Sequence, residues 1–330
     1  MVNVVSTFSG CGGSSLGYIL AGCKILLALD FEENAVKTYK LNFPNTLVWK
    51  SNIRDITGEK ILNEIKLKVG ELDIFDGSPP CNSFSMAGKR EDGWNKSYKH
   101  SSESHIQRTD DLFFEYLRLI GEIQPKIFVA ENVRGLISGV AKGYFNMILK
   151  TMKLLGYNVK VFDINAKDFD VPQSRPRIIF IGVRNDIFKE WKLLKTHKEI
   201  SFNTACIGLK IPDSELQFAK RIENHTSMQY IKLLKQGETA SKYHPKGSYF
   251  NISRINEDKP VRTILAKCSL IHPRENREIT LSECKRLSSF PDDFKFLSIH
   301  DGILRIGNSV PPNLMYHIAN YVKNILNMTI

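Results

Sequence analysis

The sequence predicts an α/β fold: a mostly parallel, doubly wound sheet with a second, smaller domain. Short apolar runs alternate with amphipathic segments through the first half of the chain, as they do in consecutive βαβ units. That alternation stops near residue 187. The chain beyond it contains polar loops, such as KQGETASKYHPKGSYF at residues 235–250. Helix periodicity returns in the final segment, VPPNLMYHIANYVKNIL, which we expect to pack back on the sheet.

The expected strands are runs rich in Val, Ile, Leu and Phe, with the expected helices between them. Strands are predicted at 2–8, 24–30, 72–77, 126–132 and 177–183. Helices are predicted at 34–43, 111–123 and 144–156, where apolar residues recur at helical spacing. Because such sheets bind ligands at the carboxyl ends of their strands, functional residues are expected just past those ends.

The break in pattern predicts two domains. The larger would comprise residues 1–185 and be completed by a C-terminal helix within 305–330, and the smaller would comprise residues 186–304. Residues 187–267 hold 15 Lys and Arg against eight Asp and Glu, and so carry most of the net charge of +11. A polyanion such as nucleic acid would explain this excess, and a generally lysine-rich proteome would explain it equally well.

Composition argues against several classes of protein. No apolar run reaches the roughly 18 residues of a membrane span. The start, MVNVVSTFSG, lacks the basic and long apolar regions of a signal peptide, so a cytoplasmic location is expected. The six cysteines form no CxxC pair and the eight histidines show no partner spacing. Neither a disulfide framework nor a metal site is therefore expected.

A glycine-rich segment, FSGCGGSSLG at residues 8–17, follows the first predicted strand and leads into a helix. Such a loop lets a ligand approach the backbone at a helix N-terminus. Asp30 ends the next strand about twenty residues on, where a ribose hydroxyl would be bound. Phe31 could stack on an adenine ring and Asp55 could accept from its amino group; a core position and a helix N-cap are the simpler interpretations. The spacing is not GxGxxG, so a purely structural turn stays open.

The segment GSPPCNSFS, residues 77–85, places Cys81 directly after two prolines at the end of an apolar run. Pro79 and Pro80 stiffen the approach, which suits a nucleophile held in one position. A thiolate is the reactive form, so such a site needs a lowered pKa or a nearby proton acceptor. On this segment alone, a buried and unreactive cysteine is the alternative.

Two further segments place charged side chains at the same predicted edge. Glu131, in KIFVAENV, ends another apolar strand, and a carboxyl group facing a dry pocket can donate a hydrogen bond or a proton. Arg175 and Arg177, in QSRPRIIFIGV, stand at alternate positions where a strand starts. They could hold a carbonyl oxygen or a phosphate. A thiol and an acid together suit attack on an electron-poor ring.

Six segments, in order, resemble the cytosine-5 DNA methyltransferases: FSGCGG, GSPPCNSFS, AENV, QSRPR, IHPRENREITLSECKRLSSFPDDF and RIGNSVPP. They cover nearly the whole chain outside 187–265. The resemblance implies a sequence-specific enzyme of the bacterial restriction–modification type, with no metal and with double-stranded DNA as its partner. It also implies a monomer, and a cognate restriction endonuclease that would act separately.

The resemblance further implies S-adenosylmethionine as methyl donor and S-adenosylhomocysteine as product. The implied cofactor residues come from the glycine loop, two later strand ends, the proline run and the GNSVPP block: Phe8, Gly10, Cys11, Gly12, Gly13, Asp30, Phe31, Asp55, Ile56, Pro79, Asn308 and Ser309. This cofactor has no phosphates, which would account for a loop that departs from the dinucleotide pattern.

For catalysis, the resemblance implies a cytosine flipped out of the duplex, because C5 and C6 cannot be reached within the stack. Cys81 would attack C6, Glu131 would bind the N3–N4 edge, Arg177 would contact O2, and Arg175 would support Arg177. Loss of the C5 proton and expulsion of Cys81 would then release 5-methylcytosine. Residues 186–304 would read the DNA sequence.

Two features depart from the family pattern. Asn82 follows the cysteine where glutamine is usual, and the segment 82–110 looks longer than in compact members. A lid over DNA fits the composition of that segment, and Trp94 could act as a wedge or pack on the surface.

Three alternative functions can be weighed against this one. A tRNA cytosine-5 methyltransferase would use the same residues. A silent nucleic-acid-binding relative should lack Cys81, Glu131 or Arg177, and all three are present. A nicotinamide oxidoreductase would require the strict glycine spacing that is missing here.

Overall fold

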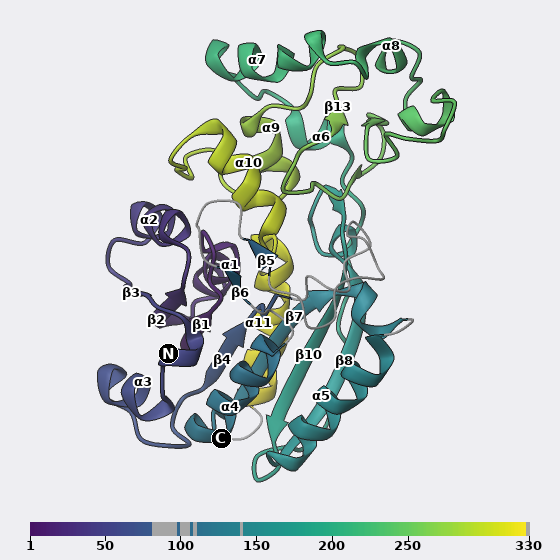
Figure 1. Cartoon of the computed structure of the whole chain (residues 1–330). Helices are drawn as coiled ribbons and strands as arrows, with labels where there is room; N and C mark the ends of the chain where they lie inside the picture. Colours follow the sequence, from purple (N-terminus) through teal and green to yellow (C-terminus); the bar gives the residue numbers. More distant parts are fainter. Residues whose placement is uncertain (81–97, 100–105, 108–110, 139–140, 328–330) are drawn as a thin grey trace.

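The computed structural model describes residues 1–80, 98–99, 106–107, 111–138 and 141–327. Its centre is a seven-stranded sheet in the order β3-β2-β1-β4-β7-β10-β8 (Figure 1). Neighbours from β3 to β7 are parallel, and β10 runs antiparallel to both β7 and β8. The predicted doubly wound α/β sheet is confirmed, and the reversed strand β10 is an addition that the sequence pattern did not indicate.

The strands of this sheet are β1 (Asn3–Thr7), β2 (Lys24–Asp30), β3 (Leu47–Lys50), β4 (Ile74–Gly77), β7 (Ile127–Val133), β8 (Tyr157–Asn165) and β10 (Pro176–Arg184). Short strands that pair outside it are β5 (Tyr98–Lys99), β6 (Ile106–Gln107), β9 (Gln173–Ser174), β11 (Ser253–Arg254), β12 (Val261–Arg262) and β13 (Leu270–Ile271). The helices are α1 (Gly13–Leu20), α2 (Glu33–Asn42), α3 (Gly58–Ile65), α4 (Leu112–Ile123), α5 (Lys142–Leu154), α6 (Phe202–Cys206), α7 (Asp213–Lys220), α8 (Met228–Ile231), α9 (Leu281–Leu287), α10 (Ile299–Asn308) and α11 (Pro312–Asn327).

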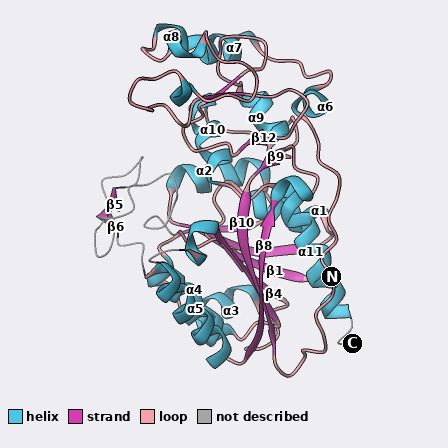
Figure 2. Cartoon of the chain, turned by 90° about the vertical axis from the view of Figure 1, so that its right-hand side faces the viewer, coloured by secondary structure: helices cyan, strands magenta, loops and turns pink. Residues whose placement is uncertain are grey.

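Helices cover both faces of the sheet. One apolar core joins α3, α4 and α5 to one face, and a second core joins α1 and α11 to the other (Figure 2). Tyr116 on α4 lies fully buried in the first core, where its hydroxyl donates to the carbonyl oxygens of Phe75 and Val129, each at 2.9 Å. The C-terminal segment packs back on the sheet as predicted, because α11 presents an apolar stripe to α1 and the strands.

Every strand and helix predicted by residue range is present, with ends displaced by no more than two residues. The strands β3 and β8 were not predicted. They are the two edges of the sheet, and β3 is only four residues long. In β8, residue Tyr157 is fully buried while most of the following positions are only partly covered, so the strand lacks the continuous apolar run of β10.

Residues 202–308 form a group of short helices and strands beyond the carboxyl ends of the sheet strands (Figure 1). Apolar residues of α6, α9 and α10 share a core with Val36, Tyr39 and Phe43 of the first half. A parallel pairing of β12 with β9 provides a second connection. Within the part of the chain that the structure describes, no helix combines the length and apolarity needed to span a bilayer.

Candidate active site at the carboxyl edge of the sheet

The glycine loop after β1 turns through left-handed backbone conformations. Phe8, Gly10 and Gly12 have φ values of 52°, 53° and 97°. Such a value costs little for glycine but strains a residue with a β-carbon, and strain of this kind concentrates at binding sites. The loop N–H of Gly10 donates to Asp30 Oδ2 at 2.8 Å, and the N–H of Glu32 donates to Oδ1 at 2.9 Å. The predicted loop and the predicted strand-end carboxylate therefore meet.

Burial raises the pKa of the Asp30 carboxyl above its ordinary value, although the two backbone N–H groups partly offset this. Asp30 also lines a small pocket at the ends of β1 and β2. The residues that line this pocket come from four strand ends and the start of α4: Phe8, Leu29, Asp30, Phe31, Ser51, Asn52, Ile53, Pro80 and Leu112. Three of the predicted cofactor residues, Phe8, Asp30 and Phe31, are thus brought together.

The segment after β3 positions other residues than those predicted. Asn52 caps a single helical turn at Ile53–Asp55, and its side-chain oxygen accepts from the Arg54 N–H at 3.2 Å. This turn points Asp55 into solvent and buries Ile56 in the core, so the structure brings neither of them to the pocket. Asn52 and Ile53 line it instead. Their position directly after β3 would have identified them, had that edge strand been recognised.

The GNSVPP block approaches the same loop from the end of α10. A β-carbon on Gly13 would lie 2.3 Å from both Ser309 Oγ and the Val310 carbonyl oxygen, so only glycine allows this contact. Cys11 Sγ lies 3.8 Å from Ser309 Oγ. Burial raises the pKa of the Cys11 thiol to about 11, which makes it a packing residue rather than a reactive one. Asn308 is exposed at the end of α10.

A buried ion-pair network, which sequence reasoning missed, holds this block in place. The Arg305 guanidinium on α10 contacts both carboxylate oxygens of Glu32, with Nη2 to Oε1 at 2.5 Å, and its Nε lies 3.0 Å from Asp301 Oδ1. Burial opposes the charge of Arg305, but the two carboxylates hold its pKa above the usual value. Since Glu32 lies two residues after Asp30, the network fixes α10 to the end of β2.

On the other side of the sheet edge, Glu131 and Arg177 form an ion pair. They lie on the antiparallel neighbours β7 and β10, where Arg177 is paired with Val133 and Ile179 with Glu131. Arg177 Nε lies 2.7 Å from Glu131 Oε1, and each side chain is only 12% exposed. Arg177 Nη1 also donates to the Pro176 carbonyl oxygen at 2.7 Å. The acid and the cation predicted from two separate segments thus meet in one partly enclosed site.

Asn132, which follows Glu131, connects this pair to the proline run. Its buried Nδ2 donates to the Pro79 carbonyl oxygen at 3.1 Å, and its Oδ1 accepts from the N–H of Val133 at 2.9 Å. The sequence analysis assigned no role to Asn132. Cys81, Asn82 and Trp94, to which it did assign or consider roles, lie outside the residues that the structure describes.

Arg175 is directed away from the Glu131 pair. Its guanidinium is buried and donates to the carbonyl oxygens of Gly307 at 2.8 Å and Ile264 at 3.1 Å. Burial lowers its pKa, and the nearby Arg177 acts in the same direction. Arg175 therefore fastens the start of β10 to the GNSVPP block and to the loop before β13, a supporting position for Arg177.

A buried carboxyl group, Asp76, lies in β4 between the two halves of the site. Its Oδ2 accepts from Ser6 Oγ at 3.0 Å and its Oδ1 from the Tyr18 hydroxyl at 3.2 Å. Burial raises the pKa of Asp76 to about 7, despite these donors.

Comparison with known proteins identifies the family to which this arrangement belongs. The family model described as C-5 cytosine-specific DNA methylase matches residues 2–324. The chain belongs to this family. It is accordingly a DNA cytosine-5 methyltransferase, and the family resemblance inferred from the sequence is confirmed.

The similar curated proteins are Type II methyltransferases of bacteria and archaea. The chain is 32% identical to methyltransferase M1.HphI of Haemophilus parahaemolyticus, over 96% of this chain and 86% of that protein. It is 30% identical to methyltransferase M.NgoPII of Neisseria gonorrhoeae, over 98% of this chain and 96% of that protein.

Among solved structures, a DNA modification methyltransferase encoded within an E. coli prophage superposes with a TM-score of 0.77 at 25% identity, covering 99% of this chain and 100% of that one. The Dnmt2 methyltransferase of S. pombe superposes with a TM-score of 0.69 at 16% identity, covering 99% of each chain, and this similarity concerns the fold alone.

The methyltransferase family and fold imply the use of S-adenosylmethionine, and the residues at the sheet edge fit that group. A β-carbon on Gly12 would clash with Phe43 and one on Gly13 with Ser309, so these glycines let the loop pack closely, whereas a β-carbon on Gly10 would point into open space. Asp30 offers a carboxylate suited to ribose hydroxyls, while Ile53, Leu112 and Phe31 offer apolar surface to a purine ring.

Proposed function

We propose that this chain transfers a methyl group to C5 of a flipped-out cytosine in duplex DNA through a transient bond between Cys81 and C6. The observation that carries the proposal is the Glu131–Arg177 ion pair at 2.7 Å, on the strand whose Asn132 holds the carbonyl of Pro79. Pro79 and Pro80 lead directly to Cys81 in the sequence. A carboxylate and a guanidinium at the sheet edge, with a cysteine next in the sequence after Pro80, suit attack on a pyrimidine ring.

In this proposal, Glu131 and Arg177 contact different atoms of the base. Arg177 holds Oε1 of Glu131, and we assign the other oxygen, Oε2, to the N3–N4 edge of cytosine. Stabilising a proton at N3 makes C6 more susceptible to the thiolate and C5 more electron-rich once the thiolate has added. The remaining N–H groups of Arg177 face the O2 position and stabilise the charge that develops there. Removal of the C5 proton then allows Cys81 to leave.

S-adenosylmethionine supplies the methyl group. We assign its ribose to Asp30, and its adenine to Phe31, Asn52, Ile53 and Leu112, which line the same pocket. This assignment differs from the sequence prediction of Asp55 and Ile56, which do not line this pocket. The Arg305–Glu32 pair and the Ser309 contact keep the pocket closed on the side of α10.

We further propose that residues 186–304 read the DNA and that the enzyme acts as a monomer within a restriction–modification system, with a separate endonuclease. The Lys and Arg excess of residues 187–267 supports a phosphate-binding surface. The Type II names of the curated relatives support the protective role.

The covalent step is tested with a duplex that carries 5-fluoro-deoxycytidine at the target position. Bisulfite sequencing of DNA from cells that express the chain first locates the methylated cytosine. Since fluorine at C5 cannot leave as a proton does, the enzyme and the duplex should accumulate as a heat-resistant adduct when S-adenosylmethionine is present. Cys81→Ala should form no adduct.

Cys284→Ala is the matched control, because Cys284 is a fully buried thiol of the α9 core and should leave adduct formation intact provided that the variant folds. A transfer RNA with 5-fluorocytidine serves as the second substrate. Adduct on the RNA alone would contradict DNA as the substrate, and an active preparation that forms no adduct on either would contradict the covalent route.

A further inference from the structure

Three potential metal ligands meet beside α11, and none of them is among the residues assigned above to the cofactor or the base. His317 lies on α11, Asp170 in the loop after β8, and His197 in the segment that leaves β10. His317 Nε2 lies 2.7 Å and His197 Nδ1 lies 3.3 Å from the same oxygen, Asp170 Oδ2. The three ligand atoms lie within 4.8 Å of one another, and the two imidazole rings have centroids 4.2 Å apart.

Two features of the fold fix the position of Asp170. Its backbone adopts a left-handed φ of 55°, and its carbonyl oxygen accepts from Asn313 Nδ2 on α11 at 2.8 Å. The His317 side chain is largely enclosed, with 14% of its surface exposed. The side chains of Asp170 and His197 are each about 40% exposed. An ion could therefore enter from solvent on the side of His197.

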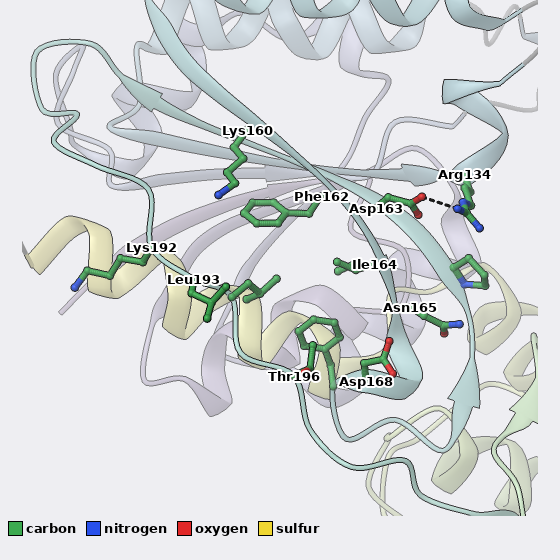
Figure 3. Close-up of a pocket in the computed structure, with 13 residues that line it drawn as sticks. Arg134, Lys160, Phe162, Asp163, Ile164, Asn165, Asp168, Lys192, Leu193 and Thr196 are labelled. Carbon is green, nitrogen blue, oxygen red and sulfur yellow. Dashed lines mark ion pairs between the residues drawn. The ribbon is translucent and has the colours of Figure 1, made fainter.

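His197 belongs to residues 186–201, which we call the strap because they cross from the end of β10 to α6 with almost no helix or strand. The strap packs Phe188, Trp191 and Leu194 against the second apolar core, and the Lys192 carbonyl accepts from the Tyr321 hydroxyl at 3.0 Å. Between Lys192 and Thr196 it faces β8 across a surface pocket of about 430 Å³ (Figure 3). Few backbone hydrogen bonds hold it, among them that from His197 N–H to the Asp168 carbonyl at 2.7 Å.

We propose that Asp170, His197 and His317 form a zinc site that fastens the strap to α11. Two imidazole nitrogens and one carboxylate oxygen, with an open fourth position for water, match a three-residue zinc site. Zinc bonds of about 2.0–2.2 Å in a tetrahedral arrangement separate ligand atoms by roughly 3.4 Å. The His197–Asp170 distance already matches that value, and the His317–Asp170 distance needs to lengthen by less than an ångström. The ligands lie far apart in the sequence, so histidine spacing could not have indicated the site.

The alternative is a hydrogen-bonded trio without a metal, and Asp170→Asn separates the two. An amide oxygen still accepts a hydrogen bond from an imidazole N–H, but it is a poor zinc ligand. Titration calorimetry of the tag-free, chelator-treated full chain with zinc chloride should show one zinc per chain for the wild type. Asp170→Asn and His197→Gln should each weaken that binding at least tenfold. His300→Gln removes an exposed histidine on α10 and should leave it unchanged.

Trypsin provides a second readout, because Lys189, Lys192, Lys195 and Lys198 all lie in the strap. Zinc should slow cleavage there by about tenfold in the wild type, and it should have no effect on Asp170→Asn, which also controls for any action of zinc on trypsin. Equal zinc binding by the wild type and Asp170→Asn would overturn the site. Binding without slower strap cleavage would overturn the fastening role. Neither readout depends on methyl transfer.

Discussion

In the proposed arrangement, the cofactor side and the base side of the active site are built differently. On the cofactor side, the site is largely backbone: left-handed residues at Phe8, Gly10 and Gly12, and a carboxylate, Asp30, that accepts from two N–H groups. On the base side, it is made of side chains, with Glu131 paired to Arg177 and Asn132 bonded to the carbonyl of Pro79. The difference reflects the two ligands, because a nucleoside can rest against a loop whereas a cytosine must be polarised by charge.

This difference predicts opposite sensitivities. The base side should tolerate no change in charge, even one that keeps the shape of the side chain. On the cofactor side, many side chains should be replaceable, but a β-carbon added to a tightly packed loop glycine should not be tolerated. The variants below test this contrast, from the largest expected effect to the smallest.

Glu131→Gln keeps the shape of the side chain and removes its charge, so it should lower turnover by about 10³-fold, in the range of acid–base groups. Cofactor affinity and folding should stay unchanged. The measurement is methyl transfer from radiolabelled S-adenosylmethionine to duplex DNA, with calorimetry for the cofactor. Asp163→Asn is the matched control, because Asp163 also pairs with an arginine, Arg134, at 2.8 Å but on the exposed edge strand. If Glu131→Gln kept more than a tenth of the wild-type turnover, the base side would not depend on charge as we propose.

Gly13→Ala adds one methyl group to the cofactor side. Its β-carbon would meet Ser309 Oγ and the Val310 carbonyl at 2.3 Å, so α1 and the GNSVPP block must separate. We expect a loss of about 3 kcal/mol in the free energy of unfolding, typical of overpacking at a backbone contact. Urea denaturation gives this value.

Gly143→Ala should change the free energy of unfolding in the opposite direction in the same assay. Gly143 is exposed on α5 with no atom within 4 Å of an added β-carbon, so alanine should stabilise the helix by up to about 1 kcal/mol. A Gly13→Ala variant as stable as wild type would show that the loop and the block are not in tight contact.

The contact between Glu131 and Arg177 was easier to predict from the sequence than the lining of the Asp30 pocket, for a physical reason. Glu131 and Arg177 interrupt long apolar strands, and a charge in such a strand needs a partner, so their meeting could be expected. Asn52 and Ile53 follow β3, an edge strand of only four residues, which is too short to show a clear strand pattern. The sequence predicted adenine contacts at Asp55 and Ile56, whereas the residues of this segment that line the pocket are Ser51, Asn52 and Ile53.

Contacts between distant segments were the least predictable. Arg305 and Glu32 are far apart in the sequence, and each alone reads as a surface charge, yet they form a buried pair. Arg175 was expected to support Arg177, but the carbonyl oxygens that it contacts, those of Gly307 and Ile264, could not be inferred from the sequence. Such pairs depend on how α10 returns to the sheet, which local patterns do not encode.

Asp76 lies between the two halves, and its substitution should change how stability depends on pH. Its folded-state pKa of about 7 is above the unfolded value, so its contribution to stability is complete below about pH 4 and is lost as the pH rises to 7. At 1.36 kcal/mol per unit, the full shift corresponds to no more than about 4 kcal/mol. We expect Asp76→Asn to gain roughly 2 kcal/mol relative to wild type between pH 5 and pH 8.

Urea denaturation of both proteins at the two pH values measures this gain. Ser6 and Tyr18 donate to Asp76, and an amide oxygen can still accept from one of them, so the variant should fold. A difference between wild type and variant that does not change with pH would mean that Asp76 is ionised throughout, and that the donors outweigh its burial.

Asp30→Ala tests the one side chain on which the cofactor side depends. It removes the carboxylate assigned to the ribose together with the acceptor for the Gly10 N–H, so S-adenosylmethionine binding should weaken more than tenfold, by about 1.4 kcal/mol. Calorimetry measures this directly. Glu33→Ala is the control: Glu33 lies three residues later, pairs with Lys37 and Lys50 on the exposed start of α2, and should leave the affinity unchanged. An unchanged affinity in Asp30→Ala would mean that the cofactor side is built from backbone alone, a sharper contrast with the base side than we propose.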